Sequence, residues 1–255
     1  MTVTYRCSGR FAYVGEAVAH WSPDGKQVLF LAHPDTVTPA ANWYLVDTGG
    51  GAVRELIHSP DYAGDAQWSP DGSRILYTGA AAGLSCGVYL VDPGTGFMTS
   101  LGVQVGKYCP FAAIWSPDGS RITYRISPIN SGEVTTVSSA GAVLSQITFA
   151  DASPAAVEWS PDGRRLKVWH VRDVGRNAYA WLASMNPDGS SRTQLTPTDG
   201  WYTGGGYSPD GHSIIHHRFY PDEGRSHIRV IDDDGGNPLE VPVRDGAPGG
   251  ATWRP

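Results

Sequence analysis

The sequence predicts an all-β protein built from repeated four-stranded antiparallel units, and three observations support this fold class. The pentapeptide WSPDG begins at residues 21, 68, 115 and 159, YSPDG begins at 207, and Trp253 continues the series. Successive aromatic positions are 47, 47, 44, 48 and 46 residues apart, a period typical of propellers and other repeat arrays. Gly (32), Pro (19), Trp (9) and Tyr (12) are abundant, and no segment has a helical hydrophobic period. Together they predict one β-propeller domain over residues 1–255.

The first two strands of each unit form a hairpin around the SPDG turn. In that turn Ser opens a type I turn, Pro presets φ, and Gly accepts the left-handed fourth position. The strand after it reads KQVLFLA, SRILYTG, SRITYRI, RRLKVWH and HSIIHHR in the five copies. The residue seven positions after the aromatic is always aliphatic, so we expect a buried row there: Val28, Ile75, Ile122, Leu166 and Ile214.

Two further strands complete each unit. The third reads WYLVD, VYLVD, VTTVS, YAWLA and IRVID, and the fourth contains AVRELI, FMTSLG, AVLSQIT, RTQLT and PLEVP. Glycine-rich turns separate the third strand from the fourth in every copy. Four antiparallel strands per repeat make a propeller blade, with units at 21–67, 68–114, 115–158, 159–206 and 207–252.

A closing blade is expected to combine both ends of the chain. Residues 1–15 supply short strands near 2–7 and 10–14, and residues 250–255 supply the innermost strand. Such closure pairs edge strands that would otherwise be exposed. We therefore expect six blades, the last one incomplete. A five-bladed ring is the alternative, and it leaves ATWRP without a place.

The repeat W-S-P-D-G-x-x-[IVL]-x-[FY], followed by Y-L-V-D, resembles that of the TolB-type, WD-like β-propellers. The resemblance covers residues 16–255 and is specific for the fold. It implies six blades, and it implies ligand binding at the rim that carries the loops after the second and fourth strands, or at the channel mouth. It says little about function, because the motif residues build hairpins and the core.

Composition excludes some classes of partner. The formal net charge is −6 and no basic stripe stands out, so we expect no nucleic-acid partner. No apolar run approaches the length of a membrane span. The N-terminal residues do not read as a signal peptide, which predicts a cytoplasmic protein unless a signal was removed, in which case it is periplasmic or secreted. We expect a monomer without a cofactor.

The three cysteines are Cys7, Cys86 and Cys109. Their spacing fits neither a disulfide framework nor a zinc site. Two interpretations stay open: a single bridge between Cys86 and Cys109, or three isolated thiols.

One set of candidate ligand-binding residues directly precedes the repeated aromatics. The residue at this position varies among the repeats, which is unusual for a purely structural core position. Its polar members, which we expect to line the channel, are His20, Gln67 and Glu158. Exposed or locally bonded groups at strand ends are the alternative.

The second set lies in the fourth and fifth repeats. His216 stands nine residues after Tyr207, where other repeats have Phe30, Tyr77, Tyr124 and Val168, so it is either a core residue or a site residue. Its expected companions at the loop-bearing rim are His170, Arg172, Trp201, Tyr202, His217, Arg218 and Tyr220. A metal site combining His170, His216 or His217 with Asp222 is conceivable, but no short ligand spacing supports it, and we predict none.

Two functions compete, and a purely structural or oligomerising module is a third. The first is a binding module that recognises a protein, a peptide or a small polar ligand at the loop-bearing rim or channel mouth. The alternative is a free-standing propeller enzyme, a lyase or hydrolase that uses the His, Arg and Tyr residues of the second set. GLSCG at 83–87 matches the nucleophile-elbow pattern, but a strand follows it instead of a helix, so Ser85 is not a predicted nucleophile.

Overall fold

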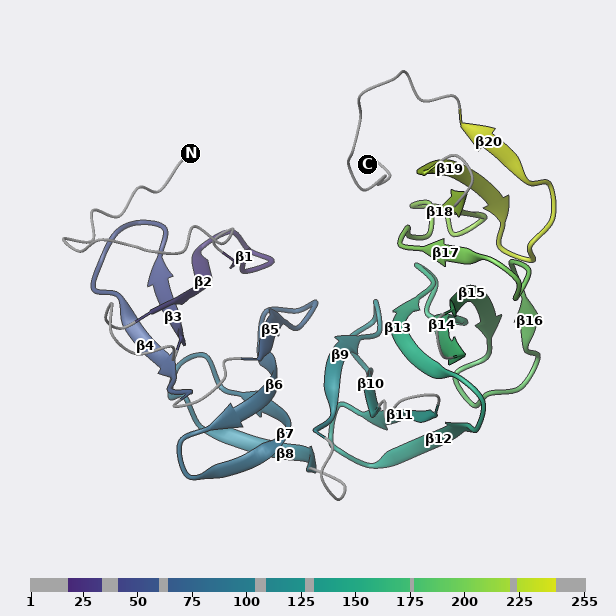
Figure 1. Ribbon diagram of the computed structural model, residues 1–255. Coiled ribbons are helices and arrows are strands. Elements are labelled where there is room, and N and C mark those ends of the chain that lie inside the picture. Colours follow the sequence, from purple (N-terminus) through teal and green to yellow (C-terminus); the bar gives the residue numbers. More distant parts are fainter. Residues whose placement is uncertain are drawn as a thin grey trace. The chain divides into compact units, whose positions relative to one another are not determined.

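The computed structural model describes residues 18–33, 41–59, 64–103, 109–126, 131–174, 177–220 and 224–241. Within these ranges the chain forms strands β1 to β20 and no helix, as the sequence predicts for an all-β protein (Figure 1). The chain divides into two compact units, Met1–Val103 and Gln104–Pro255, which are described separately.

The first unit contains two four-stranded antiparallel sheets, one for each of the first two repeats. The first sheet has the strand order β1 (Ala19–Trp21), β2 (Gln27–Ala32), β3 (Asn42–Asp47) and β4 (Arg54–Ile57). The second has the order β5 (Asp65–Trp68), β6 (Ile75–Ala81), β7 (Leu84–Val91) and β8 (Met98–Val103). Each strand pairs with its neighbour in sequence, which is the meander expected of a propeller blade.

The second unit contains the other three repeats. The third repeat forms a sheet of β9 (Phe111–Trp115), β10 (Arg121–Ile126), β11 (Gly132–Ser138) and β12 (Val143–Phe149). The fourth consists of β13 (Ser153–Trp159), β14 (Leu166–Val174), β15 (Asn177–Met185) and β16 (Thr193–Gln194). The fifth consists of β17 (Trp201–Thr203), β18 (Ser213–Tyr220), β19 (Arg225–Asp232) and β20 (Leu239–Val241). A parallel pairing of Ala180 with Trp201 joins the fourth sheet to the fifth.

The first strand of the fifth repeat departs from the expected pattern. In the other four repeats the repeated Trp is the last residue of the first strand. Here β17 ends at Thr203, and Tyr207 pairs with Ile214 only as an isolated bridge. Gly204 and Gly205 lie between them in left-handed conformations (φ +59° and +79°), which interrupt an extended strand.

The SPDG turns have the predicted geometry and one feature that the sequence did not reveal. Each turn Gly has a left-handed φ, between 68° and 78°, and its N–H donates to the Ser carbonyl. The Ser Oγ also donates to the Asp carboxylate, for example Ser69 to Asp71 at 2.6 Å. The turn glycine is also close to the proline of the preceding turn: a Cβ on Gly72 would lie 3.4 Å from Pro23, and one on Gly211 would lie 3.4 Å from Pro161. Within each unit, the repeated Pro and Gly therefore lie close together in successive turns.

Within each unit, the core lies between successive sheets. In the first unit one cluster combines Leu29 and Trp43 of the first repeat with Ile75 and Tyr77 of the second. In the second unit one cluster joins the third repeat to the fourth, and another joins the fourth to the fifth. Four members of the predicted aliphatic row are fully buried: Ile75, Ile122, Leu166 and Ile214. Val28 is only half-buried.

Both segments expected to close the ring, 1–15 and 250–255, lie outside the described residues, so six blades stay a prediction.

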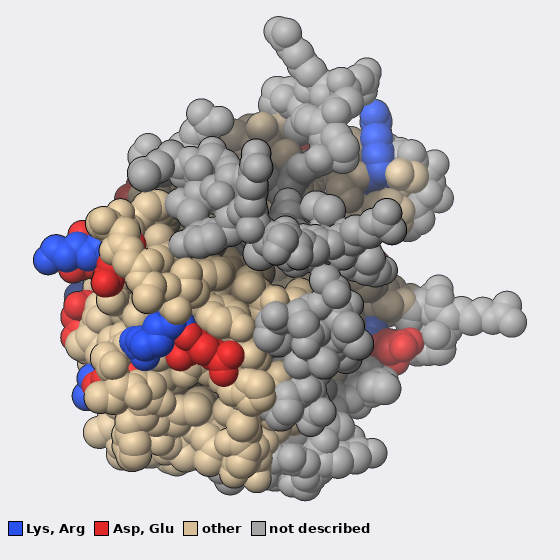
Figure 2. Space-filling view, turned by 90° about the vertical axis from the view of Figure 1, so that its left-hand side faces the viewer, with Lys and Arg blue, Asp and Glu red and all other residues tan. Residues whose placement is uncertain are grey.

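On the face shown in Figure 2, Lys and Arg side chains lie beside Asp and Glu side chains, and uncharged residues cover most of the described surface. None of the described residues belongs to a helix long and apolar enough to span a membrane.

Candidate functional site

Strand pairing in the fifth repeat collects basic and aromatic residues on one face of its sheet. Successive side chains of a strand point to opposite faces, so His216, Arg218 and Tyr220 of β18 share a face. Cross-strand pairs share a face as well. Tyr202 and His227 both stand opposite Arg218, Arg229 stands opposite His216, and Glu240 stands opposite Arg229. We call these side chains the Arg218 cluster: Tyr202, His216, Arg218, Tyr220, His227, Arg229 and Glu240.

Arg218 is the centre of this cluster. Its Cζ lies 5.3 Å from the ring centroid of Tyr202 and 4.8 Å from that of Tyr220, so two aromatic rings hold the guanidinium by cation–π contacts. No carboxylate in the described part of the chain forms a salt bridge with it. A guanidinium stacked in this way keeps its in-plane N–H donors available for a planar anion such as a carboxylate.

The inner end of the cluster is buried, and two of its side-chain polar atoms lack a hydrogen-bond partner. Tyr202 and His216 are each only 1% exposed, and their rings lie 5.8 Å apart. Within the described ranges neither the Tyr202 hydroxyl nor His216 Nδ1 has a hydrogen-bond partner. Burial lowers the pKa of His216 to about 4, and the nearby charge of Arg229 acts in the same direction, so the ring is neutral at pH 7. His216 is therefore buried like a core residue, but unlike a satisfied core histidine it has an unpaired ring nitrogen.

The outer end of the cluster is a histidine–carboxylate pair. His227 Nδ1 lies 2.6 Å from Glu240 Oε1, and the His227 ring contacts that of Tyr220 edge-on at 4.8 Å. Glu240 is exposed at the surface. A carboxylate that holds one ring nitrogen orients the imidazole, which is an arrangement used in general acid–base chemistry.

Two of the predicted companions lie elsewhere in the same repeat. His217 pairs with Thr203 and Trp201 pairs with Phe219, so both belong to the opposite face from Arg218. The period of two along β18 makes this separation unavoidable for adjacent residues. His217 and Arg218 therefore cannot act on one ligand from one face of this sheet.

His170 and Arg172 form a separate group in the fourth repeat. Both are on β14, and His170 stands opposite Trp181 of β15. The His170 ring contacts Phe149 of the third repeat, at 4.8 Å. The strand pairing thus puts His170 and Arg172 in the fourth repeat, apart from the face of β18 that Arg218 and Tyr220 share. No group of three or more His, Cys, Asp or Glu is placed to hold a metal ion within the described ranges, and Asp222 lies outside them.

The three residues that precede the repeated aromatics have different surroundings. In the first unit, the His20 ring stacks on Trp43, with 6.0 Å between the ring centroids. Gln67 of β5 is half-buried and pairs with Leu76 of β6. In the second unit, Glu158 forms an ion pair with Lys167, which is buried. Their joint role in lining a channel stays a prediction.

Sequence reasoning missed Lys167. Its Nζ donates to the Gly205 carbonyl at 2.9 Å, contacts Glu158 Oε2 and lies 5.4 Å from the Tyr207 ring centroid. Burial lowers the pKa of Lys167 more than Glu158 raises it. The sequence contained a signal for this position. Lys167 lies between Leu166 and Val168, and because side chains alternate along a strand, it belongs to the face toward the next repeat.

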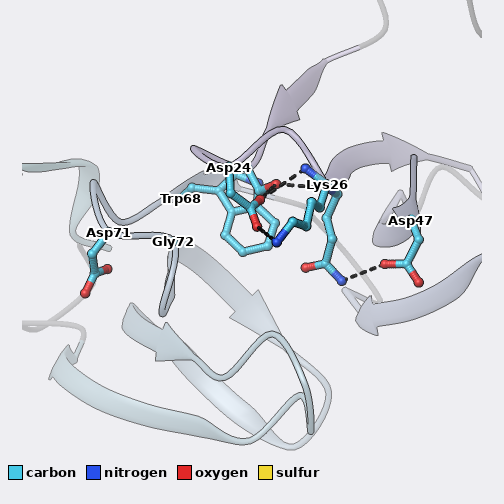
Figure 3. A pocket seen from close by; sticks show the side chains of 8 residues that line it. Asp24, Lys26, Asp47, Trp68, Asp71 and Gly72 are labelled. Carbon is cyan, nitrogen blue, oxygen red and sulfur yellow. Dashed lines mark hydrogen bonds and ion pairs between the residues drawn. The ribbon is translucent and has the colours of Figure 1, made fainter. Parts of the chain in front are cut away.

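The first unit contains a polar pocket of about 270 Å³ between its two SPDG turns (Figure 3). Asp24, Asp47 and Asp71 line it, together with Lys26 and Trp68. The structure already uses these carboxylates: Asp24 accepts from Ser22 and pairs with Lys26, Asp47 accepts from Gln27, and Asp71 accepts from Ser69. The pocket therefore follows from how the turns pack, and we assign it no ligand.

The structure shows the state of two of the three cysteines. Cys86 and Cys109 are both disulfide-bonded, so the interpretation of three isolated thiols is wrong. Cys7 lies outside the described residues.

No protein-family model matches the chain. Among solved structures, TolB from Acinetobacter baumannii matches over 89% of this chain and 54% of its own, with 21% identity and a TM-score of 0.58. Oligogalacturonate lyase from Vibrio parahaemolyticus matches over 89% of this chain and 66% of its own, with 14% identity and a TM-score of 0.67. An oligogalacturonate lyase in complex with manganese matches with 13% identity and a TM-score of 0.62, over 87% of this chain and 63% of its own.

These similarities show the fold: an all-β chain of propeller-type, four-stranded sheets that resembles TolB. The chain spans about half the length of that TolB structure. The structural neighbours include TolB proteins and oligogalacturonate lyases, so the fold alone does not choose between binding and catalysis.

Proposed function

We propose that the protein is a TolB-like propeller binding module that recognises a carboxylate group of a protein, peptide or small polar ligand through the Arg218 cluster. The observation that carries this proposal is the guanidinium of Arg218, held between the rings of Tyr202 and Tyr220 without a carboxylate partner in the described part of the chain. A cation fixed by two rings is preorganised, so binding a carboxylate requires little ordering of the arginine side chain.

The buried inner end supports the same proposal. The Tyr202 hydroxyl lacks a hydrogen-bond partner within the described ranges, and an unsatisfied buried polar group costs about 1–3 kcal/mol. A ligand that supplies an acceptor to this hydroxyl would remove that cost on binding. Arg218 and Tyr202 would then contact neighbouring oxygen atoms of one ligand.

Binding to two acidic probes tests the proposal: trigalacturonate and a glutamate-rich peptide, each titrated by isothermal calorimetry. We expect the wild type to bind at least one of them and Arg218→Gln to weaken that binding about tenfold or more, the loss typical of a charge-assisted contact. Arg164→Gln is the matched control, because Arg164 is exposed and paired with Asp162 of its own turn. Equal affinity of Arg218→Gln and the wild type for every bound probe would contradict the proposal.

The second candidate function is a lyase or hydrolase, and the His227–Glu240 pair favours it. Two of the structural neighbours are oligogalacturonate lyases, one of them in complex with manganese. Incubation of the protein with oligogalacturonate, with and without Mn²⁺, tests this alternative through the ultraviolet absorbance of the double bond that elimination creates. Turnover that His227→Gln abolishes would replace the binding proposal by the enzymatic one.

A further inference from the structure

A second group of cationic and aromatic side chains lies where the third repeat packs on the fourth. His170 and Trp181 are directly opposite each other on β14 and β15, and their rings stack at 5.3 Å. Phe149, at the end of β12, contacts the His170 ring edge-on at 4.8 Å. Two arginines complete this group, which we call the His170 cluster: Phe149, His170, Arg172, Trp181 and Arg192.

Each arginine of the cluster is stacked on one of its rings. The Cζ of Arg192 lies 4.8 Å from the Phe149 ring centroid, and that of Arg172 lies 5.6 Å from the Trp181 ring centroid. Neither guanidinium forms a salt bridge with a carboxylate of the described ranges, and the buried Nε of Arg172 has no hydrogen-bond partner there. Arg192 is exposed, so the cluster is accessible from solvent on that side.

His170 contributes an unsatisfied polar atom at the centre. The residue is only 3% exposed, and its Nδ1 has no hydrogen-bond partner within the ranges that the structure describes. Buried polar atoms of this kind are rare because they lose water without gaining a replacement. Two charges act on the His170 ring from nearby, the positive charge of Arg192 and the negative charge of Asp151.

We propose that the His170 cluster binds a doubly charged oxyanion, such as a phosphomonoester. Two stacked guanidinium groups and a neutral imidazole offer N–H donors to several oxygen atoms of one tetrahedral anion. The Arg218 cluster also contains two arginines, but only the Arg218 guanidinium is stacked on aromatic rings of the described residues, and the Glu240 carboxylate belongs to the same cluster, which suits a singly charged carboxylate better. The two sites share no residue, so this proposal does not depend on the preceding one.

Inorganic phosphate and phenyl phosphate are the probes, titrated by isothermal calorimetry, with acetate as the singly charged comparison. We expect saturable binding of both phosphates and weaker binding of acetate. Arg172→Gln and Arg192→Gln should each weaken phosphate binding about tenfold, the effect expected when one charge-assisted contact is lost. Arg164→Gln, the exposed arginine paired with Asp162, should not change it. Asp151→Asn should strengthen binding about threefold, because it removes a negative charge near the anion.

His170→Phe tests the imidazole separately, because a phenyl ring keeps the packing between Phe149 and Trp181 but removes the N–H. We expect this variant to fold, as checked by circular dichroism, and to bind phosphate more weakly than the wild type. Saturation that is absent at every phosphate concentration, or that Arg172→Gln and Arg192→Gln leave unchanged, would overturn the proposal. So would a loss of phosphate binding in Arg218→Gln alone, which would place the phosphate at the Arg218 cluster instead.

Discussion

Lys167 shows how a single residue can connect two repeats. Its Nζ reaches from β14 to the Gly205 carbonyl, which belongs to the loop before Tyr207. Its partner Glu158 remains 40% exposed, whereas the Lys167 side chain is only 5% exposed. Because Lys167 is buried, removing Glu158 or the Gly205 carbonyl contact would leave its ammonium group short of a partner. The position of Gly205 therefore matters for the pairing of the fourth repeat with the fifth.

Gly205→Ala is predicted to destabilise the protein strongly. A Cβ at Gly205 would lie 1.5 Å from the Ile215 carbonyl oxygen, and its φ of +79° is already unfavourable for alanine. Gly224→Ala is a matched control, because Gly224 has a φ of +64° and no atom within 4 Å of its Cβ position. We expect Gly224→Ala to cost about 1 kcal/mol and Gly205→Ala on the order of 3 kcal/mol or more in urea unfolding. Equal losses in the two variants would show that the contact with Ile215 is not a constraint.

At the scale of single strands, the hydrophobic pattern predicted which segments are extended, but not which polar residues meet. The five second strands and five third strands all formed at the predicted segments. The grouping of His217 with Arg218 at one rim did not take into account that adjacent residues of a strand point to opposite faces. The contact between His227 and Glu240 was not predicted, because the two residues meet only through the register of β19 and β20. That register depends on backbone pairing, which a single sequence does not specify.

Two buried strand histidines predict an acid-sensitive stability. Burial lowers the pKa of both His170 and His216 to about 4, from an ordinary value of 6.5. The unfolded chain therefore binds more protons than the folded chain between these values, and stability should fall as the pH drops from 6.5 to 4. The expected loss is about 3 kcal/mol for each histidine. Thermal unfolding between pH 7 and pH 4 measures this loss of stability. In His170→Phe the unfolding temperature should depend less on pH. An unfolding temperature of the wild type that stays constant from pH 7 to 4 would refute the prediction.

The SPDG turns predict a second and more acidic transition. The serine hydroxyl beside each turn aspartate holds its carboxyl pKa below 3.8, to about 2 for Asp71 and Asp118. This contribution is present above pH 3.8 and is lost as the pH falls toward 2. Ser69→Ala and Ser116→Ala should therefore lower the unfolding temperature at pH 5 and lower it less at pH 2. An equal effect at both pH values would show that the serine acts by packing alone.

For the molecule as a whole, the repeat predicted the architecture and left the function open. The 44- to 48-residue period, the turn residues and the strand alternation agree with one another, and this consistency made the fold class predictable. The site was only partly predictable: Tyr202, His216, Arg218 and Tyr220 do share one face, whereas His170 and Arg172 belong to another junction. Residues that differ between the copies are the candidates for function, and their contacts depend on the three-dimensional packing.

Hydrogen–deuterium exchange with and without a saturating acidic ligand would show whether the fifth repeat binds that ligand. Trigalacturonate or the glutamate-rich peptide is the probe, according to which one binds in calorimetry. We predict that slowed exchange is concentrated in peptides covering Trp201–Thr203, Ser213–Tyr220 and Arg225–Asp232, and that Arg218→Gln removes it. Slowed exchange confined to the first three repeats, or unchanged by Arg218→Gln, would contradict a binding site on the fifth repeat.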